Sequence, residues 1–312
     1  MQTRLLGHTS LHVGTIGFGA WQLNNPLWGG PDQSASLRLV HAALAAGVNF
    51  FDTAPGYGEG ASETALGLAL RGRRATAVIC TKFGHTAVPE EDFTVAALRP
   101  ALEESLRRLQ TDHVDLLLLH NPPAERFAGA PAADLYAALT ALQQEGKLRW
   151  FGASLDSRAE LQTLTQTTPG QAAEVLFNAF HQEPAAAFAA AARRGVGLIA
   201  KVPLDSGWLS GKYDETSRFA GIRERWTPAV IARRARLVQR LRALLPAGVS
   251  LPQAALGFVL AHPEIATVIP GTKSLAQLEA NLAAARTPLP AELVAQIKTL
   301  WETEISPDPL PW

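Results

Sequence analysis

The sequence predicts an α/β fold in which eight strands alternate with helices and close into a (β/α)8 barrel. Short apolar runs typical of buried strands alternate along the chain with longer runs of helical spacing. The residues expected at the ends of the first five strands, Gly19, Asp52, Lys82, His120 and Ser154, recur at intervals of 33, 30, 38 and 34 residues. This interval is the length of one strand–helix unit. The third glycine of the fingerprint that a doubly wound nucleotide-binding sheet would carry is missing after the first strand.

Each strand is expected from a short apolar run bounded by turn-forming residues. The run 114–119, VDLLLL, is too uniformly apolar to have a solvent-facing side, as is typical of parallel strands covered on both faces. The run that ends at Asp52 is followed by a loop containing Pro55 and three glycines. The expected strands cover residues 15–19, 49–52, 77–82, 114–119, 149–154, 174–179, 196–203 and 266–269.

The helices are expected from apolar residues that recur on one face. Leu98, Leu102, Leu106 and Leu109 illustrate this spacing. Residues 1–14 should form a hairpin before the barrel, and residues 204–227 a long irregular connection of the kind that often serves as a binding loop. The expected helices cover 34–46, 63–70, 94–109, 132–145, 158–167, 184–194, 228–245, 252–261 and 274–285, with an additional C-terminal helix at 290–301.

Composition bounds the domain organisation and the partners. At 312 residues and 47% hydrophobic content, the chain can form a single barrel domain spanning 1–312. Its 28 basic and 28 acidic residues cancel, so we expect no nucleic-acid partner and no anionic membrane surface. No signal peptide and no apolar run of about 18 residues occurs, which predicts a cytoplasmic protein. A monomer and a homodimer are both compatible with this composition.

A metal site is not expected. Cys80 is the only cysteine, which excludes an internal disulfide and a cysteine-based zinc site. The eight histidines form no cluster with carboxylates at ligand spacing.

Barrel geometry should bring Asp52, Tyr57, Lys82 and His120 to one mouth, because reactive residues collect at the C-terminal ends of barrel strands. A tyrosine with a pKa of about 10 exchanges protons poorly at neutral pH unless its anion is stabilised. The Lys82 ammonium can supply that charge, and Asp52 can hold the ammonium protonated and oriented. A neutral His120 can orient a carbonyl oxygen beside the phenol.

The segments FFDTAPGYG, ICTKFG and LLLLHNPP resemble the catalytic motifs of the aldo-keto reductase superfamily, and the resemblance runs from about residue 3 to residue 285. It implies that Asp52, Tyr57, Lys82 and His120 are the catalytic set, with Tyr57 as general acid in carbonyl reduction. The family binds NADPH in an extended form without a doubly wound domain, so the resemblance also implies this cofactor.

Two segments resemble the cofactor-binding parts of that family. Residues 202–212 match the loop over the pyrophosphate, and residues 269–281 match the segment for the adenosine 2′-phosphate and adenine. A helix that starts near Ser274 offers free N–H groups to a phosphate and Lys273 adds charge, which favours NADPH over NADH. Ser154, Glu174 and Lys201 fall where relatives contact the nicotinamide, although Leu155 and Glu174 replace the usual amides and Lys201 replaces an aromatic ring. The implied cofactor residues are Gly19, Trp21, Asp52, Ser154, Glu174, Lys201, Pro203, Leu204, Ser206, Gly207, Leu209, Gly211, Lys212, Ile269, Gly271, Thr272, Lys273, Gln277 and Asn281.

Aromatic residues are candidates for the substrate pocket. Tyr57, His120, Trp21 and Phe83 are the expected substrate contacts, which would favour an aldehyde or ketone with apolar or sugar-ring surface. Core packing is the other interpretation for Trp21, for Phe83 and for each of the further candidate rings. Those further candidates are Trp28, His85, Trp208, Trp226 and Trp312.

Three functions remain open from the sequence. The first is an NADPH-dependent oxidoreductase of the class acting on CH–OH donors, which reduces a small-molecule aldehyde or ketone with hydride from nicotinamide C4. The second is an NADP(H)-binding sensor subunit similar to the potassium-channel β-subunits, which share the fold and the four residues. The third is a Schiff-base aldolase that uses Lys82, although pairing with Asp52 would keep that amine charged and non-nucleophilic.

Overall fold

The computed structural model describes residues 1–26, 29–85, 91–129 and 132–311. A hairpin of β1 (Thr3–Leu5) and β2 (His12–Gly14) precedes an eight-stranded parallel sheet in the order β10-β9-β8-β7-β6-β5-β4-β3. Parallel bridges Ile16↔Val268 and Gly19↔Gly271 join the two edges, so the sheet closes on itself. The predicted (β/α)8 barrel with an N-terminal hairpin is confirmed. The strands are β3 (Phe18–Gly19), β4 (Phe50–Asp52), β5 (Val78–Phe83), β6 (Val114–His120), β7 (Leu148–Leu155), β8 (Ala172–Leu176), β9 (Gly197–Lys201) and β10 (Ile265–Val268).

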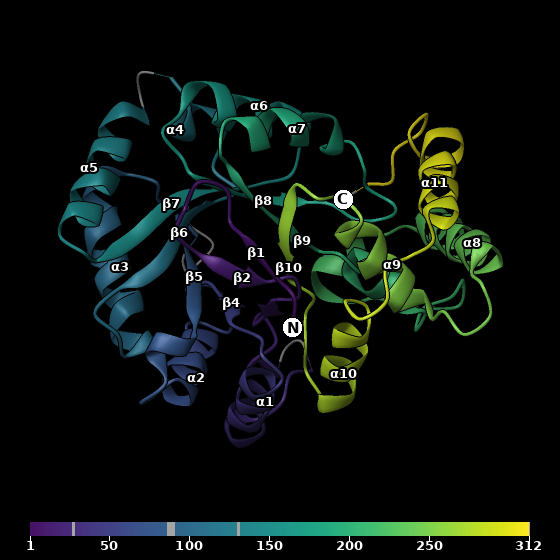
Figure 1. The fold of residues 1–312 in the computed structure, drawn as a ribbon, viewed down its shortest axis with the longest axis horizontal. Coiled ribbons are helices and arrows are strands. Elements are labelled where there is room, and N and C mark those ends of the chain that lie inside the picture. The colour runs from purple at the N-terminus through teal and green to yellow at the C-terminus, as the bar shows by residue number, and fades with distance from the viewer. Residues whose placement is uncertain (27–28, 86–90, 130–131, 312) are drawn as a thin grey trace.

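Helices surround the strands (Figure 1). Several begin where the sequence supplies a cap: the Ser157 hydroxyl accepts the Glu160 N–H while the Glu160 carboxylate accepts from the Ser157 backbone. No helix of the described residues is long and apolar enough to cross a membrane. The helices are α1 (Gln33–Ala45), α2 (Ala61–Ala69), α3 (Val95–Leu109), α4 (Ala124–Phe127), α5 (Ala133–Gln144), α6 (Arg158–Thr167), α7 (Ala185–Arg193), α8 (Pro228–Leu244), α9 (Leu251–Leu260), α10 (Leu275–Ala283) and α11 (Ala291–Leu300).

One segment differs from its predicted element and another agrees with it. The strand expected at 174–179 runs instead over Ala172–Leu176, because the chain turns directly afterwards: the Asn178 backbone pairs with His181 and its side-chain oxygen accepts the Phe180 N–H. The connection 204–227 is irregular as expected, with two short 3₁₀ helices at Asp205–Ser210 and Gly221–Arg225.

The barrel interior is filled by a small apolar cluster. Strand residues such as Phe50, Leu116 and Ile199 meet hairpin residues Leu6 and Val13 in this cluster, and all are at most 1% exposed. The hairpin therefore closes the N-terminal end of the barrel, and in Figure 1 it crosses in front of the strands. The opposite end, where the strands finish, is left for the functional groups.

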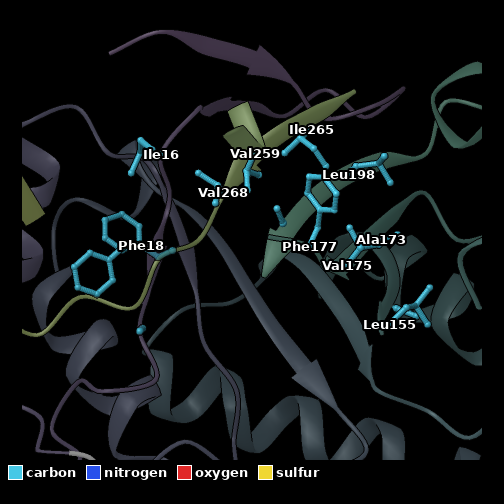
Figure 2. Close-up of a cluster of buried hydrophobic side chains, with 14 of the residues drawn as sticks. Ile16, Phe18, Leu155, Ala173, Val175, Phe177, Leu198, Val259, Ile265 and Val268 are labelled. Atoms are coloured by element: carbon cyan, nitrogen blue, oxygen red, sulfur yellow. The ribbon is translucent and has the colours of Figure 1, made fainter. Parts of the chain in front are cut away.

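A second, larger cluster fills the space between the strands and the helices. Figure 2 shows part of it: Val175 and Leu198 on neighbouring strands, with Val259 of α9 packed against the same layer. Because side chains alternate along a strand, these residues face outward while their neighbours face the barrel interior. This alternation decides which strand residues reach the mouth.

Candidate active site

Strand alternation brings charged and polar groups to one end of the barrel. On five strands, the residue two places after a member of the inner apolar cluster is ionisable, and it faces the same interior. Along each of these strands, the side chains that face the interior change from apolar to ionisable within two residues. The pairs are Phe50 and Asp52, Cys80 and Lys82, Leu118 and His120, Ala172 and Glu174, and Ile199 and Lys201.

Lys82 lies at the centre of this group. Its Nζ donates to both Asp52 carboxylate oxygens at 2.7 Å and to the Thr53 carbonyl at 3.1 Å. Glu174 Oε2 is 3.4 Å from the same nitrogen. All three charged side chains are buried. Although burial lowers the pKa of Lys82, the Asp52 and Glu174 carboxylates raise it well above the ordinary value, so the amine is an ammonium.

Tyr57 lies over this ammonium, in the loop after β4. Its ring centroid is 5.2 Å from Lys82 Nζ, and the Trp21 ring stacks on it at 5.7 Å between centroids with 14° between planes. Burial raises the pKa of Tyr57; Lys82 opposes that rise, while the carboxylates of Asp52 and Glu174 add to it. The phenol therefore holds its proton at neutral pH and is a donor.

His120 stands beside Tyr57 as a neutral imidazole. The two ring centroids are 6.0 Å apart with an angle of 84° between the rings. Burial, together with the positive charges of Lys82 and Lys201, holds the pKa of His120 well below its usual range. Its Nδ1 is buried with no hydrogen-bond partner in the part of the chain that is described. The ring of His85 lies 4.9 Å away and forms an edge contact with it.

A polar network occupies the adjoining part of the mouth. Lys201 Nζ donates to Asn121 Oδ1 at 2.7 Å and to Ser154 Oγ at 2.8 Å, and it forms an ion pair with Asp156 at 2.8 Å. Ser154 Oγ in turn donates to Glu174 Oε1 at 3.1 Å. Sequence reasoning did not predict that Asn121 and Asp156 join this group, or that Glu174 faces Lys82. The two-residue step from the apolar interior was the available signal for Glu174.

The donors Asp52, Cys80 and Glu174 lie within 4.8 Å of one another, a spacing that a metal ion could use. Lys82 Nζ is within hydrogen-bond distance of Asp52 and 3.4 Å from Glu174. The cation that these carboxylates hold is therefore the lysine ammonium. Burial raises the pKa of Cys80, which keeps its thiol neutral.

The segment 269–281 leads from the end of β10 into the start of helix α10. Helix α10 begins after Ser274, whose hydroxyl accepts the Gln277 N–H, and no acidic residue lies in the first turn. The Lys273 N–H donates to Gln277 Oε1 at 3.0 Å, and buried Asn281 donates to Thr272 Oγ1 at 3.1 Å. A Cβ built on Gly29 would lie 3.4 Å from Lys273 Nζ, which places this ammonium beside the loop before α1. The arrangement suits a phosphate group.

The segment 202–212 is a tightly folded loop with a second lysine against it. Val202, Asp205 and Ser206 have positive φ angles of 52°, 45° and 53°. A Cβ on Gly207 would lie 3.2 Å from Lys212 Nζ, so the ammonium lies against this half-buried turn. With Lys273, the loop provides two separate cations, which fits the separate phosphate groups of a dinucleotide.

Several aromatic candidates do not reach the mouth. Trp208 and Trp226 are 0% and 3% exposed, and they pack with Tyr213 and Phe219 in a cluster behind the loop. Phe83 is also buried, as is the cofactor candidate Leu209. Trp28 and Trp312 lie outside the described residues. Trp21, at 38% exposed, is the candidate ring that the structure places against Tyr57.

Comparison with known proteins adds four findings. A family model described as the Aldo/keto reductase family matches residues 15–302. L-galactose dehydrogenase of Arabidopsis thaliana is 30% identical over 292 residues, covering 91% of this chain and 88% of that protein. An aldo-keto reductase of Schizosaccharomyces pombe whose name specifies NADP(+) is 29% identical over 314 residues, covering 95% and 90%. The holo structure of an aldo-keto reductase from Bacillus halodurans superposes with a TM-score of 0.80 at 30% identity, covering 96% of each chain.

Proposed function

Because this chain belongs to the aldo/keto reductase family, whose members use a nicotinamide cofactor, we propose that it is an NADPH-dependent reductase of aldehydes and ketones. It would form one barrel domain over residues 1–312. The S. pombe relative is named for NADP(+), and the A. thaliana relative is named as a dehydrogenase of a sugar, which supports a carbonyl and alcohol substrate pair.

The observation that carries the proposal is that Tyr57 lies beside both an ammonium and a neutral imidazole. Lys82 Nζ is 5.2 Å from the Tyr57 ring centroid, and the His120 ring lies 6.0 Å from it at 84°. Tyr57 would donate its proton to the substrate oxygen, and the Lys82 charge would stabilise the phenolate that remains. His120 would orient the same oxygen through a ring nitrogen. When bound, the cofactor supplies the hydride.

The residues for the cofactor are those of the two phosphate-accepting segments and the mouth. Lys273 and the start of α10 would hold the 2′-phosphate that distinguishes NADPH from NADH, and Lys212 with the 206–207 turn would hold the pyrophosphate. Ser154, Glu174 and Lys201 remain candidates for the nicotinamide side of the site. The raised pKa of Lys82 argues against an aldolase, because an ammonium is not a nucleophile.

The test is a fluorescence titration with NADPH and NADH on the wild type and on Lys273→Ala, followed by turnover of an aldehyde panel by the wild type and Tyr57→Phe. Lys298→Ala, which changes an exposed lysine on α11, is the matched control for the binding arm. Tyr136→Phe is the control for turnover, because this hydroxyl donates to the Phe127 carbonyl at 2.7 Å beside α5.

We expect tight NADPH binding that weakens in Lys273→Ala, and turnover that is lost in Tyr57→Phe alone. Tight binding with no turnover of any carbonyl would instead favour a nucleotide-sensing subunit. Absence of binding to either nucleotide would exclude both functions.

A further inference from the structure

Glu174 is a second buried carboxylate beside Lys82, and both of its carboxylate oxygens face other groups of the site. Its Oε2 is 3.4 Å from Lys82 Nζ, its Oε1 accepts from Ser154 Oγ at 3.1 Å, and the residue is 2% exposed. Asp52 already takes up the same ammonium with both of its oxygens at 2.7 Å. Two carboxylates therefore share one cation in a dry environment.

This arrangement differs from every other buried carboxylate among the described residues. Each of the others faces at least one guanidinium of its own: Glu63 with Arg108, Asp115 with Arg74 and Arg149, and Asp205 with Arg234. The nearby Lys201 is itself paired with Asp156 at 2.8 Å, so including these two residues leaves the charge balance unchanged. Fully ionised, the Asp52, Glu174 and Lys82 group would carry one uncompensated negative charge directly under Tyr57.

An uncompensated buried charge is so costly that a protein normally neutralises it by taking up a proton. We propose that Glu174 is a positioning residue for the reaction, which shares one proton with Asp52 and so keeps the buried group around Lys82 neutral beneath Tyr57. The role in the reaction rests on the proposed reductase function. The shared proton does not depend on it.

The surrounding groups agree with this assignment. Burial, with the Glu174 carboxylate adding to it, raises the pKa of Asp52 to about 8. Burial alone would also raise the pKa of Glu174, but the Lys82 and Lys201 ammonium groups bring it below its usual value. Asp52 is therefore the member of the pair that would carry the proposed proton at neutral pH. The titratable groups that face the pair are Tyr57 in the loop after β4, Cys80 and Lys82 on β5, His120 on β6 and Lys201 on β9.

The shared proton can be observed without turnover by infrared spectroscopy of the protonated carboxyl group. In the wild type we expect a protonated-carboxyl band at neutral pH that disappears as the pH rises through about 8. The band should be absent at neutral pH from Glu174→Gln and from Asp52→Asn, because the single remaining carboxylate is then matched by Lys82 and ionised. Glu63→Gln is the matched control, and it should retain the band because Glu63 Oε2 already accepts from Arg108 at 2.6 Å.

The second readout is the pH profile of alcohol oxidation, which needs the Tyr57 anion. Removing one negative neighbour should move the acidic limb of kcat/KM, where Tyr57 becomes protonated, to lower pH in Glu174→Gln, by about one pH unit. Glu174→Asp keeps the charge and should restore the wild-type profile.

A band that persists in folded Glu174→Gln, or that is absent from the wild type below pH 7, would overturn the proposal. If Glu174→Gln does not fold, the same band is measured in the other two variants. Asp52→Asn should lack the band, and Glu174→Asp, which keeps both carboxyl groups, should retain it. A wild type with the band but no turnover would contradict only the proposed function.

Discussion

Arg234 of α8 and Asp205 of the loop after β9 form a buried ion pair, with the two side chains 1% and 3% exposed. The same guanidinium donates from Nη2 to the Pro311 carbonyl at 2.8 Å and lies 5.1 Å from the Trp226 ring. One arginine thereby connects the proposed pyrophosphate loop, helix α8 and the C-terminal tail. Asp205 has a positive φ of 45° within this loop.

Replacing Arg234 with Met should destabilise the protein strongly. The change leaves the Asp205 carboxylate buried without a cation, which typically costs about 3–5 kcal/mol. Urea unfolding at neutral pH measures the loss. Arg240→Met is the control, because its partner Glu304 is on the surface, and exposed pairs contribute less than about 1 kcal/mol. Adding Asp205→Asn to Arg234→Met should recover part of the stability, and a double variant no more stable than the single one would contradict this account.

Trp21→Ala should impair the use of carbonyl substrates more than the binding of cofactor. The indole stacks on Tyr57 at 5.7 Å and is 38% exposed, so it can cover a substrate beside the phenol. Loss of one stacked aromatic contact, at about 1.4 kcal/mol, would lower kcat/KM about tenfold. Steady-state kinetics on an aldehyde series measure the effect.

Trp21→Phe is the matched variant, and it should retain most of the activity because it keeps a ring in the same place. Equal losses in both variants would show that the indole acts through something other than stacking.

The barrel and the positions of its strand ends could be predicted from the sequence, because both depend on local patterns. Apolar runs and helical spacing define each element, and the interval between Asp52, Lys82 and His120 matches one strand–helix unit. The Glu174 contact with Lys82 could not be predicted in the same way, because β5 and β8 are not neighbours and their distance depends on the closure of the whole barrel. The Asp205–Arg234 pair depends on a left-handed backbone conformation in a loop, which no spacing rule specifies.

Lys212→Ala and Lys273→Ala should affect the two nicotinamide nucleotides differently. Lys212 lies against the 206–207 turn, where it would meet the pyrophosphate that NADPH and NADH share. Lys273 lies at the start of α10, where it would meet the 2′-phosphate that NADPH alone carries. We expect Lys212→Ala to weaken both nucleotides by a similar factor and Lys273→Ala to weaken NADPH about tenfold while sparing NADH, as loss of one charge-assisted contact of about 1.4 kcal/mol predicts.

Parallel fluorescence titrations of both variants with both nucleotides make the comparison. A Lys273→Ala protein that loses NADH and NADPH equally would show that its role is structural rather than selective.

His120 should make the stability of the protein sensitive to mild acid. Burial and the nearby ammonium groups hold its pKa well below the value of about 6.5 expected in the unfolded chain. Between these two values the unfolded chain binds a proton that the folded protein does not, so the free energy of unfolding falls as the pH drops below about 6.5. The slope from one such histidine approaches about 1.4 kcal/mol per pH unit.

His120→Asn removes this contribution, so its stability should fall less than that of the wild type between pH 7.5 and pH 5.5. Urea unfolding at the two pH values measures the difference, with the exposed His12→Asn as the control. His181 and His262, whose pKa values burial also lowers, remain in all three proteins and cancel from the comparison. If wild type and His120→Asn lose the same stability on acidification, the imidazole is not held neutral by the fold, and its proposed role as a neutral orienting group would need to be abandoned.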